Sequence, residues 1–272
     1  MPAETPTILA TSGGLLPDAR TFIRPGPLLD LALELCTPGD VPRLCFLNTA
    51  GGDQAWWNGA IHAAYYDRDV RVSCLNLFPM PNVADPAAHL LAQDAVWVGG
   101  GSTANLLALW RLHGLDTMLR RCWESGVVLA GVSAGSICWH LGGTTDSFGP
   151  DLRPVTDGLG FLPFSNGVHY DAEEQRRPLF HRLVADGTLP DGYATDNGVG
   201  LVYRGTEMVE AVSEAAGQGA YRVQRGPAGG VEETRMEPRL LPGAAEGPSR
   251  AVSRPGGGRN GPTGQTGPSR QA

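Results

Sequence analysis

Short apolar runs alternate with amphipathic stretches over the first half of the chain. The apolar runs predict five strands, at Thr7–Thr11, Arg43–Asn48, Val70–Leu75, Asp94–Val98 and Val127–Ala130. The stretches between them predict helices over Leu28–Cys36, Asp53–Tyr66, Ala87–Leu91, Thr103–Trp110 and Leu115–Glu124. This alternation indicates an α/β domain with a mostly parallel sheet that helices cover on both faces. Ligands of such a sheet bind beyond the carboxyl ends of its strands.

The second half of the chain is less regular. Gly142–Gly160 is rich in glycine and polar residues and predicts loops. Glu173–Ala185 predicts a helix, because its apolar residues follow helical spacing. Late strands are predicted at Gly200–Tyr203, Met208–Val212 and Gly219–Val223, in an order that the pattern does not determine.

Composition changes once more near the C-terminus. Residues 244–272 are dominated by Gly, Pro, Ser and Arg, contain no aromatic residue, and have one branched aliphatic, Val252. Such a segment cannot bury enough apolar surface to offset its ordering entropy. We therefore predict one folded domain over residues 1–243 and a disordered tail over 244–272. The tail carries four arginines, but a solvated tail without a role is favoured over a nucleic-acid or membrane contact.

Bulk properties narrow the class of protein. The 272 residues are 42% apolar, which is ample for the core of one sizeable domain, and the net charge of −7 argues against a nucleic-acid surface. No apolar run is long enough to span a bilayer, and Met1–Thr5 contains an acid but no basic residue to begin a signal peptide. Five widely spaced cysteines support neither a zinc site nor a disulfide framework. We expect a cytoplasmic protein that does not bind membranes.

The most informative motif is Gly131-Val132-Ser133-Ala134-Gly135. It follows the predicted strand Val127–Ala130 and precedes Ser136–His140, which can continue as a helix. A strand, a Gly-x-Ser-x-Gly turn and a helix form a nucleophile elbow, in which the serine projects from a sharp turn. The helix N-terminus behind the serine favours developing negative charge. The motif predicts a hydrolase that forms an acyl-enzyme at Ser133.

The activating base is predicted to be a histidine. All 21 Lys-plus-Arg positions are arginine, so a serine–lysine dyad and a Schiff-base lysine are excluded. His140 is expected on the elbow helix, pointing away from the site, and four further histidines, His62, His89, His113 and His181, are expected to be structural or exposed. His169 lies just past a predicted turn and an apolar stretch, where it can reach the edge that carries Ser133. A loop histidine without a catalytic role remains the alternative.

A triad also needs a carboxylate and an oxyanion hole. Asp146 is the first candidate for the carboxylate, followed by Asp151 and Asp171. Backbone N–H groups of Ala134 and Gly100 are predicted to hold the oxyanion, because Gly99–Gly101 ends a strand and begins a helix. Gly99, Gly101 and Ala104 also fit a loose dinucleotide-binding pattern, but the next strand ends in the elbow and lacks the acidic residue that would hold a ribose.

Three ordered segments together resemble the serine dipeptidase E family, the aspartyl dipeptidases, with cyanophycinases as more distant relatives. The segments are Gly99–Thr103, Gly131–Ser136 and Pro163–Asp171, and the similarity runs from about Ile8 to about Leu241. The resemblance implies a three-layer α/β/α fold like that of class I glutamine amidotransferases. It implies Ser133 as nucleophile, His169 as base and Asp146 as the acidic partner, with no metal and no cofactor.

One departure from this family concerns substrate recognition. Aspartyl dipeptidases place an arginine shortly after the histidine motif to hold the substrate carboxylate. Here Glu173 occupies that position and Arg176 lies nearby. Either Arg176 binds the substrate or the preference for acidic residues is altered.

The sequence therefore predicts a serine peptidase that hydrolyses short peptides, with Asp-X dipeptides as the first candidate class, as a monomer or homodimer. An α/β-hydrolase-type esterase is one alternative, although that fold usually places its histidine farther downstream. A non-catalytic binding domain of amidotransferase-like fold is the other.

Overall fold

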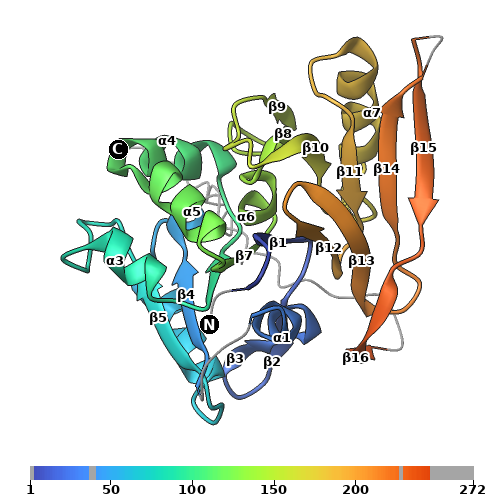
Figure 1. Ribbon diagram of the computed structural model, residues 1–272. Coiled ribbons are helices and arrows are strands. Elements are labelled where there is room, and N and C mark those ends of the chain that lie inside the picture. Colours follow the sequence, from blue (N-terminus) through green and yellow to red (C-terminus); the bar gives the residue numbers. More distant parts are fainter. Residues whose placement is uncertain (1–2, 37–40, 227–228, 246–272) are drawn as a thin grey trace, which may run out of the picture.

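The computed structural model describes residues 3–36, 41–226 and 229–245, and contains two large sheets with helices packed against them (Figure 1). The last described strand, β16, ends at Ala245. The predicted boundary after residue 243 therefore falls within a strand, and the rest of the predicted tail, residues 246–272, lies outside the described residues.

The larger sheet has eight strands and contains all five strands predicted for the first half of the chain. Its strands, in spatial order, are β16 (Arg239–Ala245), β13 (Glu207–Ala215), β12 (Val199–Arg204), β1 (Thr7–Thr11), β7 (Val128–Val132), β6 (Ala95–Val98), β4 (Arg43–Leu47) and β5 (Arg71–Leu75). The run from β1 to β5 is parallel, whereas β12 is antiparallel to both β1 and β13. The predicted mostly parallel sheet is thus confirmed.

Helices cover both faces of this sheet. The helices are α1 (Pro27–Glu34), α2 (Ala55–Ala64), α3 (Pro86–Leu91), α4 (Thr103–His113), α5 (Leu115–Glu124) and the single turn α6 (Ala134–Ile137). Within β1, Ile8 and Ala10 belong to a core with α3, α4 and α5, whereas Leu9 belongs to a separate core with α1 and α2. Because successive side chains of a strand point to opposite faces, this division shows that the sheet lies between two helical layers. The predicted α/β/α sandwich is confirmed.

A second sheet of six strands lies beside the first, with α7 (Arg176–Asp186) against it (Figure 1). Its strands, in spatial order, are β15 (Val231–Met236), β14 (Ala220–Arg225), β11 (Gly192–Thr195), β10 (Leu162–Gly167), β8 (His140–Thr145) and β9 (Arg153–Val155). β8, β10 and β11 are parallel to one another. A small hairpin, β2 (Leu15–Asp18) and β3 (Phe22–Pro25), follows β1, and a 3-10 turn, η1 (Thr49–Gly51), follows β4.

The loop predicted over Gly142–Gly160 was wrong in part, because it contains most of β8 and all of β9. A Cβ on Gly142 would lie 2.1 Å from the carbonyl oxygen of Val155, and one on Gly143 would lie 2.3 Å from that of Asn166. These glycines permit a close approach of neighbouring strands. Their frequency suggested a loop because the same residue type marks turns.

The position predicted for His140 was also wrong. α6 ends at Ile137, so His140 begins β8 instead of extending the elbow helix. Its imidazole is fully buried, with Nδ1 2.9 Å from the Ser136 carbonyl oxygen and Nε2 3.2 Å from the Tyr203 hydroxyl. Burial lowers the pKa of His140 to about 4, so this ring is neutral at pH 7 and has a structural role.

Candidate active site

Ser133 lies in the sharp turn between β7 and α6. Its backbone has φ 58° and ψ −113°, a conformation that a residue with a side chain rarely adopts. The amides of Ser136 and Ile137 donate to the Ser133 carbonyl oxygen and begin the helical turn. The Ser133 amide donates to the carbonyl oxygen of Thr11, which ties the turn to the neighbouring strand β1. The elbow predicted from the sequence is present at the carboxyl edge of the sheet.

The two glycines of the motif are required by close backbone contacts. A Cβ on Gly135 would lie 2.2 Å from the carbonyl oxygen of Val98 at the end of β6. A Cβ on Gly131 would lie 2.4 Å from the carbonyl oxygen of Gly135 and 2.8 Å from that of Val98. The turn can therefore close against β6 only when both positions lack a side chain.

The glycine loop after β6 packs against the nucleophile. Its ends are held by the Gly99 amide, which donates to the Leu47 carbonyl oxygen, and by the Ser102 amide, which donates to that of Ala50. A Cβ built on Gly100 would lie 3.3 Å from the Cβ of Ser133 and 3.9 Å from its Oγ. Gly100 and Ser133 are thus brought together, as an oxyanion hole built from the Gly100 and Ala134 amides requires.

His169 follows β10, in the second sheet, with a left-handed φ of 54°. Its amide donates to the Ser12 hydroxyl across 3.2 Å, and that hydroxyl lies 2.7 Å from the hydroxyl of Thr195. Because Ser12 directly follows Thr11, which holds the Ser133 amide, one dipeptide contacts both candidate catalytic residues. The nucleophile and the histidine are therefore both attached to the same short segment, although they follow strands of different sheets.

The imidazole of His169 is hydrogen-bonded to an amide side chain. Nδ1 lies 2.5 Å from Oδ1 of Asn197, in the connection between β11 and β12. Since a carboxamide oxygen can only accept, Nδ1 carries the proton and Nε2 has the free lone pair of a general base. Burial lowers the pKa of His169, and Arg176 acts in the same direction, whereas the Asn197 hydrogen bond opposes them.

The carboxylates predicted to orient this histidine lie elsewhere. Asp146 and Asp151 are both exposed. Asp146 lies between Thr145, whose hydroxyl donates to that of Thr103, and Ser147, whose hydroxyl accepts the Ala104 amide. These contacts direct the loop after β8 towards the start of α4. The hydrogen bond predicted from His169 to Asp146 is therefore replaced by one to Asn197.

Asp171, the third candidate, is hydrogen-bonded to Asn197 and not to His169. One of its carboxylate oxygens accepts a hydrogen bond from the backbone N–H of Asn197 across 2.8 Å, and the other accepts one from the Gln218 side chain across 2.9 Å. Its contact with the histidine is thus indirect.

Arg176 is buried, with 3% of its surface exposed, and both terminal nitrogens of its guanidinium have partners within the protein, whereas its Nε has no hydrogen-bond partner among the described residues. Its guanidinium donates to the carbonyl and hydroxyl oxygens of Thr144 and lies 2.5 Å from the carboxylate of Glu173. The charge expected to attract an acidic substrate is therefore paired with an acidic side chain of the protein itself.

Two residues of the site, Ser12 and Asn197, were not among the sequence-based candidates. Ser12 directly follows the first predicted strand, and Asn197 precedes a glycine in the connection between β11 and β12. An Asn-Gly pair is typical of turns, so the local sequence carries no signal of a contact with His169.

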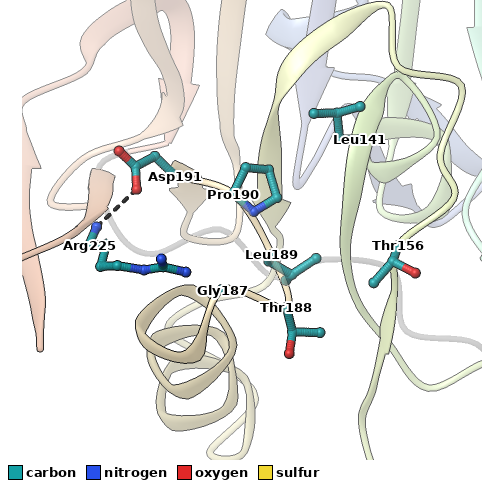
Figure 2. Close-up of a pocket in the computed structure, with 8 residues that line it drawn as sticks. All are labelled: Leu141, Thr156, Gly187, Thr188, Leu189, Pro190, Asp191 and Arg225. Atoms are coloured by element: carbon teal, nitrogen blue, oxygen red, sulfur yellow. Dashed lines mark hydrogen bonds between the residues drawn. The ribbon is translucent and has the colours of Figure 1, made fainter. Parts of the chain in front are cut away.

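A separate open cavity of about 460 Å³ lies at the end of the second sheet that is remote from His169. Figure 2 shows the residues that line this cavity. Leu141 lines it near the start of β8, and Asp191 lines it just before β11, where Arg225 donates its amide to the Asp191 carboxylate. Since β8, β10 and β11 are parallel, this cavity adjoins their amino ends, whereas His169 follows the carboxyl end of β10. The cavity is distinct from the candidate site.

None of the described helices is long and apolar enough to cross a membrane.

The chain is similar to known proteins in both sequence and fold. Residues 8–211 match the model of peptidase family S51. Over 182 residues the chain is 43% identical to the uncharacterized peptidase YgaJ of Bacillus subtilis (strain 168), an alignment that covers 67% of this chain and 78% of that protein. It is 30% identical over 146 residues to peptidase E of Streptomyces coelicolor, covering 52% of this chain and 58% of that protein.

The fold is also found in a solved structure, that of a peptidase from an acI-B1 actinobacterium. The TM-score is 0.61 at 16% identity, with 86% of this chain and 95% of that chain covered. The resemblance to peptidase E seen in the three sequence segments is confirmed, and the chain belongs to peptidase family S51, as a serine peptidase.

Proposed function

We propose that this chain hydrolyses short peptides through an acyl-enzyme formed at Ser133. The observation that carries the proposal is the strained backbone of Ser133, at φ 58°, with Gly100 packed directly against its side chain. A strained serine at a sheet edge, beside a glycine loop, is the arrangement that acyl transfer needs.

In the proposed reaction, the Ser133 hydroxyl attacks the peptide carbonyl while Nε2 of His169 accepts its proton. The amides of Gly100 and Ala134 stabilise the negative charge that develops on the carbonyl oxygen. When the C–N bond breaks, the imidazolium returns the proton to the leaving amine. Water then attacks the ester, with His169 again as the base, and releases the acid and free Ser133.

For the substrate, we propose short peptides with no strong requirement for an N-terminal aspartate. The support is the ion pair between Arg176 and Glu173, which neutralises the guanidinium beside the site. Both groups act on the pKa of His169, in opposite directions, which shows that they lie within electrostatic range of the base. This proposal is tested by comparing the rates of hydrolysis of Asp-X dipeptides and of dipeptides with a neutral N-terminal residue.

The decisive experiment compares wild type, Ser133→Ala and the control Ser125→Ala, which changes an exposed serine after α5. Each protein is assayed on a panel of dipeptides and tripeptides that includes Asp-X and Ala-X sequences. We expect Ser133→Ala to lose at least about 10³-fold in kcat, with an unchanged melting temperature, and the control to keep full activity.

A serine-directed phosphonate provides a second measurement. Mass spectrometry should find one adduct, on the peptide that contains Ser133. Full peptide turnover by Ser133→Ala would overturn the proposal. Turnover of an aryl ester without turnover of any peptide would favour an esterase.

A further inference from the structure

We propose that Asn197 is the positioning residue of His169, and that the connection Asp196–Gly198 aligns the base on one sheet with the nucleophile on the other. This inference rests on the proposed function, because it assigns a role within the same catalytic site. It is carried by contacts on three sides of Asn197: its side chain, its backbone and its neighbours in the chain.

The side chain determines which nitrogen of His169 can act. Oδ1 of Asn197 accepts from Nδ1 across 2.5 Å, which fixes the tautomer and the plane of the ring. Nε2 is then the nitrogen available to the serine proton. Without this contact, the ring could rotate about its side-chain bonds and populate the other tautomer, which presents a protonated Nε2.

The backbone of Asn197 is clamped on both sides. Its backbone N–H donates to the Asp171 carboxylate across 2.8 Å, and its backbone carbonyl oxygen accepts from the Gln218 side chain across 3.0 Å. The same Gln218 nitrogen also donates to Asp171, across 2.9 Å. The three residues form a closed hydrogen-bonded ring that holds the backbone from which the Asn197 side chain extends to His169.

The neighbours of Asn197 attach this ring to both sheets. On one side, Asp196 is buried and accepts the Gly219 amide across 2.8 Å and the Tyr221 hydroxyl across 3.1 Å, both from the second sheet or the turn that leads into it. On the other side, the Gly198 amide donates to the Ser12 carbonyl oxygen across 3.0 Å. Since Ser12 also holds the His169 amide, the connection controls the distance between base and nucleophile.

The chemistry of an amide differs from that of a carboxylate in this position. Asn197 orients the ring but contributes no full negative charge to stabilise the imidazolium. The charged groups acting on His169 are Arg176, which lowers its pKa, and Glu173 and Asp171, which raise it. Replacing Asn197 by aspartate adds a charge in direct contact with Nδ1 and should raise the pKa of the base.

The test measures kcat, KM and the pH dependence of kcat/KM for wild type, Asn197→Ala, Asn197→Asp and Gln224→Ala, on a peptide that wild type hydrolyses. Gln224→Ala is the matched control, because it removes a side-chain amide of β14, in the six-stranded sheet, that makes no contact with His169. We expect Asn197→Ala to lower kcat about 10²-fold with little change in KM, and the control to behave as wild type. Asn197→Asp should remain active, with the acid limb of its pH profile displaced upward by about one pH unit.

Two outcomes would overturn the inference while leaving the proposed function intact. One is a folded Asn197→Ala protein with the wild-type kcat. The other is an Asn197→Asp protein whose acid limb coincides with that of wild type, which decides the matter even if Asn197→Ala does not fold. Failure of the proposed function would instead appear as full peptide turnover by Ser133→Ala, whatever the behaviour of the Asn197 variants.

Discussion

The guanidinium of Arg176 lies 2.5 Å from the carboxylate of Glu173, three residues earlier in the chain. Arg176 is 3% exposed, whereas the Glu173 side chain is 41% exposed, so the carboxylate stands between the buried cation and solvent. A substrate that approaches from solvent therefore meets a neutral ion pair instead of a free positive charge.

Glu173→Gln should increase the preference for acidic substrates. The substitution removes the charge that neutralises Arg176 but keeps a side chain of the same shape. We expect the ratio of kcat/KM for Asp-X over Ala-X dipeptides to rise roughly 5- to 10-fold, the equivalent of about 1 kcal/mol of electrostatic attraction. Glu174→Gln, at the adjacent exposed glutamate, is the control and should leave the ratio unchanged. An unchanged ratio in an active Glu173→Gln enzyme would exclude Arg176 from substrate selection.

Gly100→Ala should impair catalysis more than stability. The new methyl group would lie 3.3 Å from the Ser133 Cβ, tighter than an ordinary contact, and would displace the loop or the nucleophile by a few tenths of an ångström. Because oxyanion donors act only at the correct distance, we expect kcat to fall about 10²-fold.

The control for that substitution is Gly59→Ala, in α2, where a Cβ meets nothing within 4 Å. It should retain activity and gain about 0.5–1 kcal/mol in the free energy of unfolding. Equal activities of the two variants would argue against a role for the glycine loop.

The pH dependence of kcat/KM should reflect the burial of His169. A general base must be neutral, and both burial and Arg176 lower the pKa of this imidazole from its ordinary value of 6.5. The acid limb of the profile should therefore have its midpoint below pH 6.5, and activity should persist in mildly acidic buffer. A midpoint above 6.5 in wild type would mean that a different group is titrating.

Glu214→Gln should change how stability depends on pH. Glu214 is 2% exposed, accepts the Gly14 amide across 3.1 Å, and has its pKa raised by burial from 4.5 to about 7. Between these values the folded state binds a proton that the unfolded state has lost, so this group's contribution to stability decreases as pH rises from 4.5 to 7. The glutamine side chain of Glu214→Gln does not titrate, so this variant does not show that decrease in the free energy of unfolding.

The measurement is urea denaturation at pH 5 and pH 8. Relative to wild type, the free energy of unfolding of Glu214→Gln should increase between the two pH values, by at most about 3 kcal/mol. Glu207→Gln, at an exposed position of the same strand β13, should show no such change. A constant difference between Glu214→Gln and wild type at both pH values would show that Glu214 titrates normally.

The features that could be predicted from the sequence are those that depend on neighbouring residues. The strand at Thr7–Thr11 and the other inner strands of the parallel run were identified because a strand buried on both faces is a short apolar run. The elbow at Ser133 was identified because its glycines and its flanking strand are adjacent in the chain. His169 was singled out for a similar reason, as a histidine just beyond an apolar stretch.

The partners of these residues were decided by tertiary contacts between distant segments. The sequence favoured Asp146 behind His169, but the structure brings Asn197 there, because the connection between β11 and β12 crosses from one sheet to the other beside Ser12. Likewise, Arg176 was identifiable as a cation near the site, but its hydrogen bonds to Thr144 depend on how α7 packs against β8. The local pattern of the sequence indicates which side chains are buried and where the chain turns. Hydrogen-bond partners that are distant in the chain depend instead on which strand ends lie next to each other in the folded sheets.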